Sequence, residues 1–256
     1  MWTDLVEQAE AVITRKAELD FTAIAVEDPN ATLRRFGAAA ATRLPTLPQR
    51  VPYNKVRGYR SADRRALKEV LEFYAEQALL PAVEVWAGDA TTELHHTLLD
   101  AGLAPSTPTV TLHARPRPEA AAPQAAVQEV GLNDERYLEV LYGGYETPAS
   151  DVVFRRMLAI EHSTPGLRRY VALIDGHPAA AGSLFTHNKV GYFAGAATLP
   201  KYRRRGCQAA LIDRRLADAA AEGSDLVVVT AAFGSPSHDN LARHGFGITH
   251  TRTIWQ

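Results

Sequence analysis

The chain has 256 residues, with 28 Lys or Arg against 29 Asp or Glu and a formal net charge of −1. This length allows one large domain or two small ones, and the balanced charge argues against a dedicated nucleic-acid binder. We expect no membrane span and no signal peptide, and the single cysteine, Cys207, excludes a disulfide framework and predicts a reducing cytoplasm.

The first half of the sequence predicts a small α/β unit. A helical pattern covers residues 63–78, a strand pattern covers 82–86, and a helix end with Gly102 precedes a strand at 107–112. A Pro- and Ala-rich segment without apolar periodicity follows. This segment predicts a linker at 116–125 between a first domain at 1–115 and a second domain at 126–256, and we expect the first to be a degenerate copy of the second.

The second half predicts a mixed α/β sheet, because antiparallel strand patterns come first and a strand–helix–strand pattern follows. Asp175-Gly176 is a hairpin turn signal between two of its strands. The expected strands are 127–130, 169–174, 179–186, 190–199, 225–231 and 248–255, and the expected helices are 133–141, 152–161, 208–222 and 239–244.

The two halves show a weak internal repeat. Strand 82–86 corresponds to 226–230, and helix 63–78 corresponds to 208–222. Gly102 and Gly245 each follow a helix end and precede a strand. This pattern favours duplication of one α/β unit, and chance similarity of helix–Gly–strand endings is the alternative.

The segment 200–212 is the most informative motif, because a basic turn with a glycine joins a strand to a long helix. Unpaired amides at a helix N-terminus bind phosphate, and Gly206 lets the backbone approach the anion. The arginines at 203–205 can add charge-assisted hydrogen bonds. The alternative is a solvated, Arg-rich helix start. The first half has no glycine at the matching place, and Asp63 there is typical of a helix N-cap.

This order of elements, with Arg203-Arg204-Arg205-Gly206-Cys207 after the fourth strand, resembles the GNAT-type N-acetyltransferases, whose acetyl-CoA loop follows Arg/Gln-x-x-Gly-x-Gly/Ala. Gln208 stands where the family has a second small residue, which is a modest departure because backbone amides bind the pyrophosphate. Gly245-Phe246 matches the family's frequent Gly-Phe before the last strand. The resemblance covers residues 127–256 and implies the acyl-CoA N-acyltransferase fold, present here in tandem with a degenerate first copy.

The resemblance implies acetyl-CoA, or another acyl-CoA, as cosubstrate and no metal. The end of the fourth strand would contact the pantetheine arm, and the loop would hold the pyrophosphate. Asn240 would lie near the thioester, with helix capping as its alternative role. A lowered thiol pKa is conceivable for Cys207 at a helix start, but small-residue packing is the favoured interpretation. The cosubstrate residues predicted in this way are Ala197, Thr198, Leu199, Arg204, Arg205, Gly206, Cys207, Gln208, Ala209 and Asn240.

The implied reaction is direct transfer from a thioester to an amine, and the ammonium must first lose a proton. The candidate bases are Glu146, Asp151, Glu161 and His187; the alternative for Glu146 is a solvated loop acid, and for His187 an exposed hairpin residue. Many relatives have a tyrosine four residues before the closing glycine, where this chain has Leu241. Tyr192 or His244 could replace it as proton donor, or the thiolate leaves unaided. The predicted catalytic residues are Glu146, Tyr192 and Asn240.

The sequence therefore predicts an N-acyltransferase acting on the primary amine of a small molecule, with the first half lining the acceptor site. A non-catalytic acyl-CoA sensor is one alternative, which Leu241 favours. An acyltransferase that takes its donor from a carrier protein or transfer RNA is another. Membrane and nucleic-acid partners are not expected, and both a monomer and a homodimer remain open.

Overall fold

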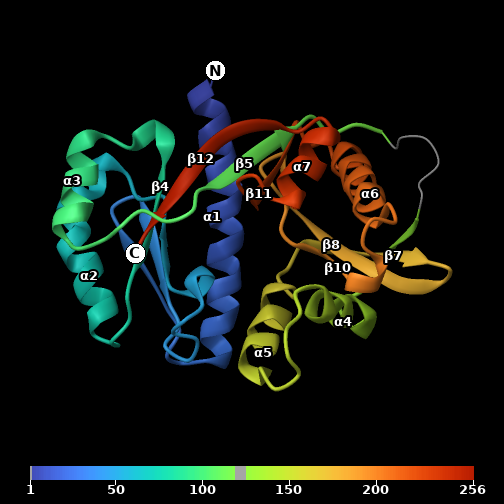
Figure 1. The fold of residues 1–256 in the computed structure, drawn as a ribbon, viewed down its shortest axis with the longest axis horizontal. Helices are drawn as coiled ribbons and strands as arrows, with labels where there is room; N and C mark the ends of the chain where they lie inside the picture. Colours follow the sequence, from blue (N-terminus) through green and yellow to red (C-terminus); the bar gives the residue numbers. More distant parts are fainter. Residues whose placement is uncertain (1, 119–124) are drawn as a thin grey trace.

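The first half of the chain begins with a long helix and continues as a small α/β unit (Figure 1). Apolar residues recur at helical spacing along the first helix and are buried, among them Ala9, Val12 and Ile24. Gly37, at a φ of 62°, forms the tight turn between the first two strands. The elements of this half are α1 (Trp2–Glu27), β1 (Thr32–Phe36), β2 (Ala39–Arg43), η1 (Val51–Tyr53), β3 (Lys55–Arg57), η2 (Ser61–Ala66), α2 (Leu67–Ala75), β4 (Ala82–Trp86), η3 (Ala87–Asp89), α3 (Thr92–Asp100) and β5 (Thr109–Ala114).

The second half is a larger α/β unit, and three of its helices start at short polar caps. The side chains of Asp134, Asp151 and Ser235 each accept a hydrogen bond from an amide in the first turn of the helix that follows. Its elements are β6 (Ala126–Val130), α4 (Glu135–Gly144), α5 (Val152–Glu161), β7 (Leu167–Ile174), β8 (His177–His187), β9 (Val190–Phe193), β10 (Ala196–Thr198), η4 (Pro200–Tyr202), α6 (Cys207–Ala221), β11 (Leu226–Ala232), α7 (Pro236–Arg243) and β12 (Gly247–Trp255).

The strands form one 12-stranded sheet in the computed structural model, which describes residues 2–118 and 125–256. The order is β1-β2-β3-β4-β12-β5-β11-β9-β8-β7-β6, and β10 pairs with β8 outside this path. The pairs β3·β4 and β9·β11 are parallel and the other pairs are antiparallel. This confirms the predicted mixed, mostly antiparallel α/β sheet flanked by helices.

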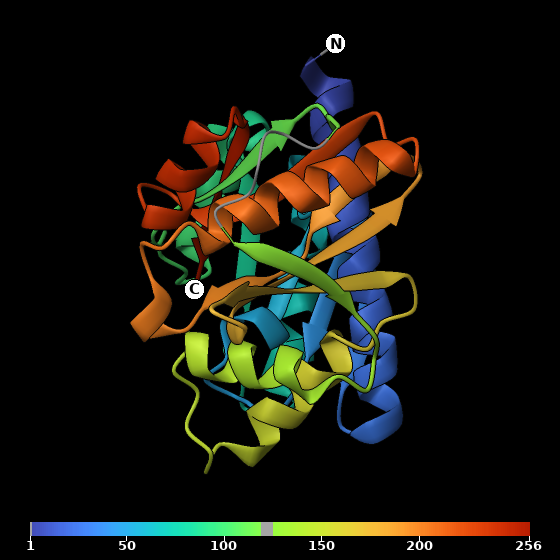
Figure 2. The ribbon, with the colours of Figure 1, turned by 90° about the vertical axis from the view of Figure 1, so that its right-hand side faces the viewer.

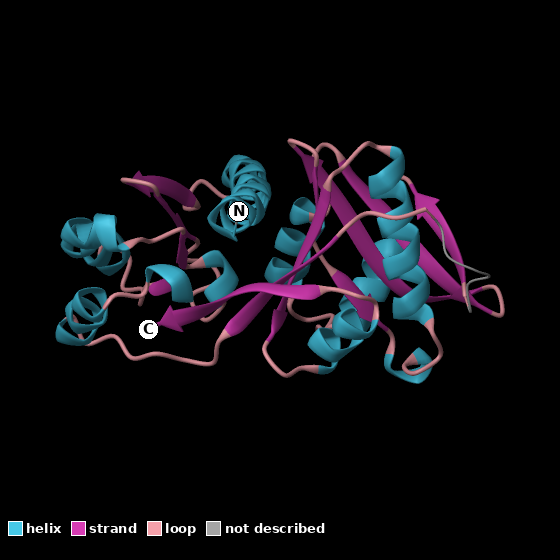
Figure 3. Cartoon of the chain, turned by 90° about the horizontal axis from the view of Figure 1, so that it is seen from above, coloured by secondary structure: helices cyan, strands magenta, loops and turns pink. Residues whose placement is uncertain are grey.

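The two halves repeat the same order of pairing and exchange their last strands. β1·β2·β3·β4 and β7·β8·β9·β11 both run antiparallel, antiparallel, parallel. The last strand of the first half, β5, pairs with β11 of the second, while β12 pairs with β4 of the first. β5 and β12 pair with each other at the centre. Figure 3 shows α1 between the two groups of elements, with β12 crossing from one group to the other.

Helices cover both faces of the second half's sheet. α6 packs on one face through Leu211 and Leu216, against Tyr170 and Leu184 of the strands. On the opposite face, α1 of the first half packs against β8, β9 and β11, burying Val12 beside Val228. Figure 2 shows α6 in front of these strands and α1 behind them. The first half is therefore part of the second half's hydrophobic core.

The strand exchange bears on the predicted division of the chain. Residues 116–118 lie in a loop after β5, and 119–124 of the predicted linker fall outside the described residues. The boundaries 1–115, 116–125 and 126–256 stay a prediction, and the sheet and the core cross them.

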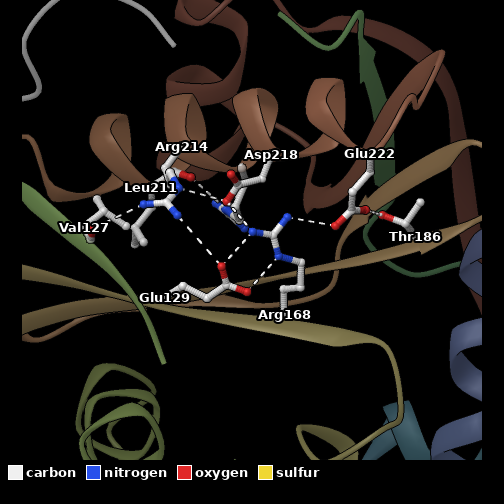
Figure 4. A network of polar contacts seen from close by, with 9 residues as sticks. Val127, Glu129, Arg168, Thr186, Leu211, Arg214, Asp218 and Glu222 are labelled. Atoms are coloured by element: carbon white, nitrogen blue, oxygen red, sulfur yellow. Dashed lines mark hydrogen bonds and ion pairs between the residues drawn. The ribbon is translucent and has the colours of Figure 1, made fainter. Parts of the chain in front are cut away.

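A network of ion pairs holds α6 on the sheet (Figure 4). Arg168 of β7 donates two hydrogen bonds to Glu129 of β6, of 2.8 and 2.7 Å. The same guanidinium lies 3.0 Å from Asp218 and donates to Glu222 at 2.8 Å, both near the end of α6. These contacts, above all the paired hydrogen bonds to Glu129, raise the pKa of Arg168. The side chain is 25% exposed, so solvent screens the network only in part.

We predict that Arg168→Met lowers the free energy of unfolding by about 1–2 kcal/mol, because Glu222 loses its ion pair and Glu129 and Asp218 keep only Arg214 as a cation. Urea denaturation measures this change. Arg136→Met is the matched control, because Arg136 is exposed and its ion pair is with Asp134, two residues away, beside one 3.4 Å hydrogen bond to Gln128. An equal effect of the two substitutions would contradict the role given to the network.

Candidate functional site

The site is centred on a break in one strand. The pattern at 190–199 predicts a single strand, but the structure divides it into β9 and β10 at Ala194-Gly195. β9 runs parallel to β11 as far as the pair Phe193 and Val229. Beyond the break, β10 pairs with β8. The edge of β10 that faces β11 therefore opens into a gap.

Gly195 is required at this break by close packing. A Cβ at this position would lie 2.8 Å from Cε1 of His162, which no real side chain tolerates. His162 is buried, its Nδ1 lies 2.7 Å from the hydroxyl of Tyr137, and burial lowers its pKa to about 3. A neutral imidazole thus supports the strand break from behind.

The loop after β10 leads into α6 without a capping side chain among the described residues. Gly206 is the N-cap at a φ of 77°, and Arg204 also has a positive φ of 63°. These left-handed residues turn successive amides in the same direction, as in an anion-binding nest. The first amides of a helix have no partner within the helix, so those at the start of α6 are available to an anion.

The gap and the loop open into one cleft of about 1220 Å³. The structure brings most of the predicted residues together in its wall: Tyr192, Ala197, Thr198, Arg204, Gly206, Cys207, Gln208, Ala209 and Asn240. Gln208 donates to the hydroxyl of Thr198 at 2.9 Å, which links the helix start to β10. The backbone carbonyl of Asn240 lies 2.7 Å from Nδ1 of His244.

Three predicted residues lie at the edge of the cleft and do not line it. The side chain of Leu199 packs near Gly143, and Arg205 pairs with Asp175 at 3.2 Å. Glu146 is 64% exposed and pairs with Arg203 at 2.9 Å. Their roles stay predictions. Cys207 is buried, and burial raises the pKa of its thiol, which supports the packing interpretation.

In the first half, carboxylates bind the amides at the corresponding place. Asp63 accepts hydrogen bonds from the amides of Arg60, at 3.1 Å, and Ala38, at 3.2 Å. Asp89 accepts one from the amide of Ser61 at 2.7 Å. Asp63 occupies the third position of η2 instead of the N-cap itself, which is Arg60. These carboxylates stand where a phosphate would bind, so the first half is closed to such a ligand.

A second cavity, of about 170 Å³, lies behind the cleft, and we call it the chamber. Tyr192, Ala194 and Thr230 line both cavities and form the boundary between them. The remaining residues of the chamber come from both halves of the chain: Ile13, Lys16, Ala17, Asp20, Phe21, Pro52, Tyr53, Lys55, Arg57, Glu161, His162 and Arg252.

Glu161 is the candidate base that lines this chamber. Burial, and then the nearby charge of Asp20, raise its pKa to about 7. The other candidates lie elsewhere: Asp151 caps α5 and pairs with Arg50 at 2.8 Å, and His187 stacks on Phe185.

The sequence analysis missed the chamber residues of the first half. Lys16 and Asp20 lie on α1 on the same face as the buried Ile13 and Ile24. A lysine and an aspartate four residues apart within an apolar helical stripe are a detectable signal, because charged residues are rarely buried unless they are paired. Arg57, on a three-residue strand, carries no such signal.

Within residues 2–118 and 125–256, no group of three or more His, Cys, Asp or Glu side chains could hold a metal ion. The helices in these two ranges are all too short or too polar for a bilayer crossing.

Residues 134–246 match the model of the acetyltransferase (GNAT) family. These residues form a GNAT domain. No protein with a curated description matches the chain. Among solved structures, a GCN5-related N-acetyltransferase from Kribbella flavida has a TM-score of 0.63 at 15% identity and covers 92% of this chain and 94% of its own. One from Sphaerobacter thermophilus has a TM-score of 0.60 at 15% identity, covering 85% and 76%.

A tandem GNAT protein from the clavulanic acid biosynthesis pathway has a TM-score of 0.61 at 16% identity, covering 97% of this chain and 94% of its own. The family match confirms the predicted GNAT-type acyltransferase assignment. The structural matches confirm the fold, and the tandem protein extends the likeness to nearly the whole chain.

We predict that Glu161→Gln stabilises the protein at pH 8 by about 1–3 kcal/mol and has little effect near pH 4.5. The raised pKa means that the folded state holds the Glu161 proton more tightly than the unfolded chain, whose pKa is near 4.5. The wild-type protein therefore loses stability as the pH rises from 4.5 through 7, and the neutral amide does not. Melting temperatures across this range measure the difference, and the exposed Glu146→Gln is the control. A stabilisation that does not depend on pH would refute the explanation.

Proposed function

We propose that the protein is an acyl-CoA-dependent N-acyltransferase that transfers an acyl group, in the first instance acetyl, to the primary amine of a small molecule. The observation that carries this proposal is the continuity of the open edge of β10 with the uncapped start of α6. An extended thiol-bearing arm needs backbone partners along its length, and a diphosphate needs amides and cations at its end. The cleft has both in that order.

The residues of the cleft fit such a cosubstrate. Amides at the start of α6 would hold the diphosphate, and Arg204 lies in the cleft wall where its guanidinium can add charge-assisted hydrogen bonds. The edge of β10 at Ala196 and Ala197 would pair with the amides of the pantetheine arm. The cavity of about 1220 Å³ is larger than an ordinary drug-sized pocket, as a nucleotide with a long arm requires.

The chemistry follows from the boundary between the cleft and the chamber. An amine in the chamber loses a proton to Glu161, and its nitrogen attacks the thioester carbon at Tyr192 and Thr230. A carbonyl oxygen that gains charge there can accept a hydrogen bond from an amide on the edge of β10. The carbon–sulfur bond breaks as the amide forms. Leu241 is 4% exposed and cannot donate a proton, so the weakly basic thiolate leaves without a donor at that place.

The chamber also favours an enzyme over a non-catalytic sensor. A sensor needs a site for the acyl-CoA alone, whereas here a polar cavity adjoins the cleft across Tyr192, Ala194 and Thr230. A donor held on a carrier protein or transfer RNA would need a wide entrance with excess positive charge. The arginines at the rim are partly neutralised instead, Arg203 by Glu146 and Arg205 by Asp175.

We further propose a cytoplasmic location, on the ground of composition. The chain has one cysteine, and in the structure it is a buried free thiol. Such a thiol is typical of proteins that fold and work in a reducing compartment.

We predict that Gly206→Glu abolishes the rise in melting temperature that acetyl-CoA or CoA causes in the wild-type protein. The new side chain places a negative charge at the amides proposed to bind the diphosphate. Gly223→Glu is the matched control, since it adds the same charge at a similar positive φ of 73° beyond the other end of α6. Normal stabilisation of the Gly206 variant by the ligand, or none of the wild type at millimolar ligand, would contradict the cosubstrate site.

We predict that kcat/KM for the amine falls as the pH drops below about 7, because Glu161 must be ionised to accept the ammonium proton. Glu161→Gln should lower kcat by about 100-fold or more and remove this limb of the profile. Release of free CoA thiol measures the rate, with Glu69→Gln on the exposed face of α2 as control. A Glu161→Gln variant that keeps the wild-type profile would exclude Glu161 as the base.

A further inference from the structure

The chamber is lined by charged side chains that are not all paired with one another. Its lining includes the cations Lys16, Lys55, Arg57 and Arg252 and the carboxylates Asp20 and Glu161. Burying charged groups is costly unless they are paired. The pairing inside the chamber therefore separates the groups that serve the fold from those that can serve a ligand.

One side of the chamber is a closed structural network. Glu84 accepts a hydrogen bond from Lys55 at 2.6 Å and another from Arg252 at 2.9 Å. Arg252 also lies 3.1 Å from Glu10, which in turn lies 2.6 Å from Nε2 of His250. The nearby cations lower the pKa of Glu84, although its burial acts in the opposite direction. Lys55 and Arg252 are thus neutralised by carboxylates of the protein itself.

Arg57 is a chamber cation that this network does not neutralise. In the described part of the chain, no carboxylate lies within ion-pair distance of its guanidinium. It donates only to uncharged oxygens, the carbonyl of Pro52 at 2.9 Å and the hydroxyl of Thr42 at 3.3 Å. A guanidinium has more N–H donors than these two bonds use, in a planar arrangement that matches a carboxylate. Arg57 is therefore positioned to receive an anionic group in the chamber.

The other side of the chamber carries negative charge. Lys16 pairs with Asp20 at 2.5 Å and donates to the backbone carbonyl of Glu161 at 2.9 Å. The Lys16 ammonium thus pairs with the carboxylate of Asp20 alone, and the carboxylate of Glu161 has no cation within ion-pair distance among the described residues. A bound ammonium would supply the missing positive charge beside Glu161. The chamber is therefore complementary to a molecule with an amine at one end and an anion at the other.

The size of the chamber limits the ligand. Its volume is about 170 Å³, and a cavity of about 150 Å³ holds one benzene molecule. An aminoglycoside or a peptide chain does not fit this space, whereas a small amino acid does. The chamber shares Tyr192, Ala194 and Thr230 with the cleft, so the amine would meet the thioester beside these residues.

We propose that the acceptor is a small primary amine that also carries a carboxylate, an amino acid in the broad sense, held in the chamber with its carboxylate on Arg57 and its amine beside Glu161 and Asp20. This inference rests on the proposed acyl-CoA-dependent function and adds the acceptor class. Arg57 is then a specificity-determining residue contributed by the first half to chemistry performed on the second.

The transfer balances as follows. The ammonium gives one proton to Glu161, and the free amine forms a bond to the thioester carbon. The carbon–sulfur bond breaks and the sulfur leaves with its electron pair. The nitrogen loses a second proton, and one of the two protons is taken up by the thiolate. The products are an N-acyl amino acid, CoA thiol and one proton released to solvent.

The first test uses the wild-type protein with acetyl-CoA and a panel of matched amines. Glycine, β-alanine and γ-aminobutyrate are compared with methylamine, ethylamine and propylamine, which are the same amines without the carboxylate. We expect kcat/KM for at least one amino acid to exceed that of its partner by about 100-fold or more, since a site built to bind a charged group rejects ligands without it. Measuring kcat/KM for each of the standard amino acids then identifies the side chain that the enzyme prefers.

The second test uses Arg57→Met, which keeps the length of the side chain and removes the charge. We expect KM for the amino acid to rise by about 10- to 100-fold, with KM for acetyl-CoA unchanged and partial recovery in Arg57→Lys. Arg64→Met, which removes an arginine paired with Glu93 in the same half, is the control for folding and charge.

The outcomes separate this inference from the proposed function. Acetyl-CoA could stabilise the protein normally while CoA is released only in the presence of carboxylate-free amines, or with no amine at all. That result would overturn the acceptor class and leave the cosubstrate site intact. Equal loss of activity toward both classes of amine in Arg57→Met would also overturn it. Absence of any stabilisation by acetyl-CoA would contradict the proposed function itself, and this inference with it.

Discussion

The site depends on the break between β9 and β10, where hydrogen-bonded pairing with β11 ends. β9 and β10 are consecutive in the chain and both pair with β8, yet only β9 also pairs with β11. Unpaired backbone groups inside a protein are costly, so such a gap persists only if neighbours support it and a ligand or water satisfies it. The support comes from close packing. Gly195 lies against the neutral ring of His162, and Gly144 of α4 lies so close to Ala197 that a Cβ on Gly144 would clash with it. Larger residues at either glycine would push β10 out of this position.

The exchange of last strands determines what each half can do. Because β5 lies between β11 and β12, the second half's sheet is completed by a strand of the first, and α1 covers its other face. A duplicated unit that had kept two ligand loops would carry two equivalent clefts. Here Asp63 and Asp89 occupy the amides of the first loop, and the first half contributes the chamber wall instead. The second half thus carries the cleft, and the first half completes the chamber that residues of both halves line.

Regular features with a local cause could be predicted from the sequence. The helix Val152–Glu161 has the expected bounds, because an Asp cap and an apolar stripe determine it locally. The loop before α6, which we propose binds the diphosphate, was also recognisable, since a glycine between a strand and a helix has few structural roles. The break at Ala194 was not, because small residues suit both a continuous strand and a bent one, and the choice depends on His162, distant in the chain. The chamber could not be found for the same reason: its charged residues come from both halves and meet only in the folded protein.

The chamber's charges also explain why a fused first half is useful to a transferase. A base such as Glu161 works near neutral pH only if burial raises its pKa, and burial needs a wall on every side. A single copy of this sheet exposes the face that α1 covers here. With α1 and β3 in place, the same wall that shields Glu161 brings Lys16 and Arg57 close to it. Desolvation of the proposed base and the proposed recognition of the acceptor would therefore both follow from one packing arrangement, which ties the position of these charged groups to the stability of the interface between the halves.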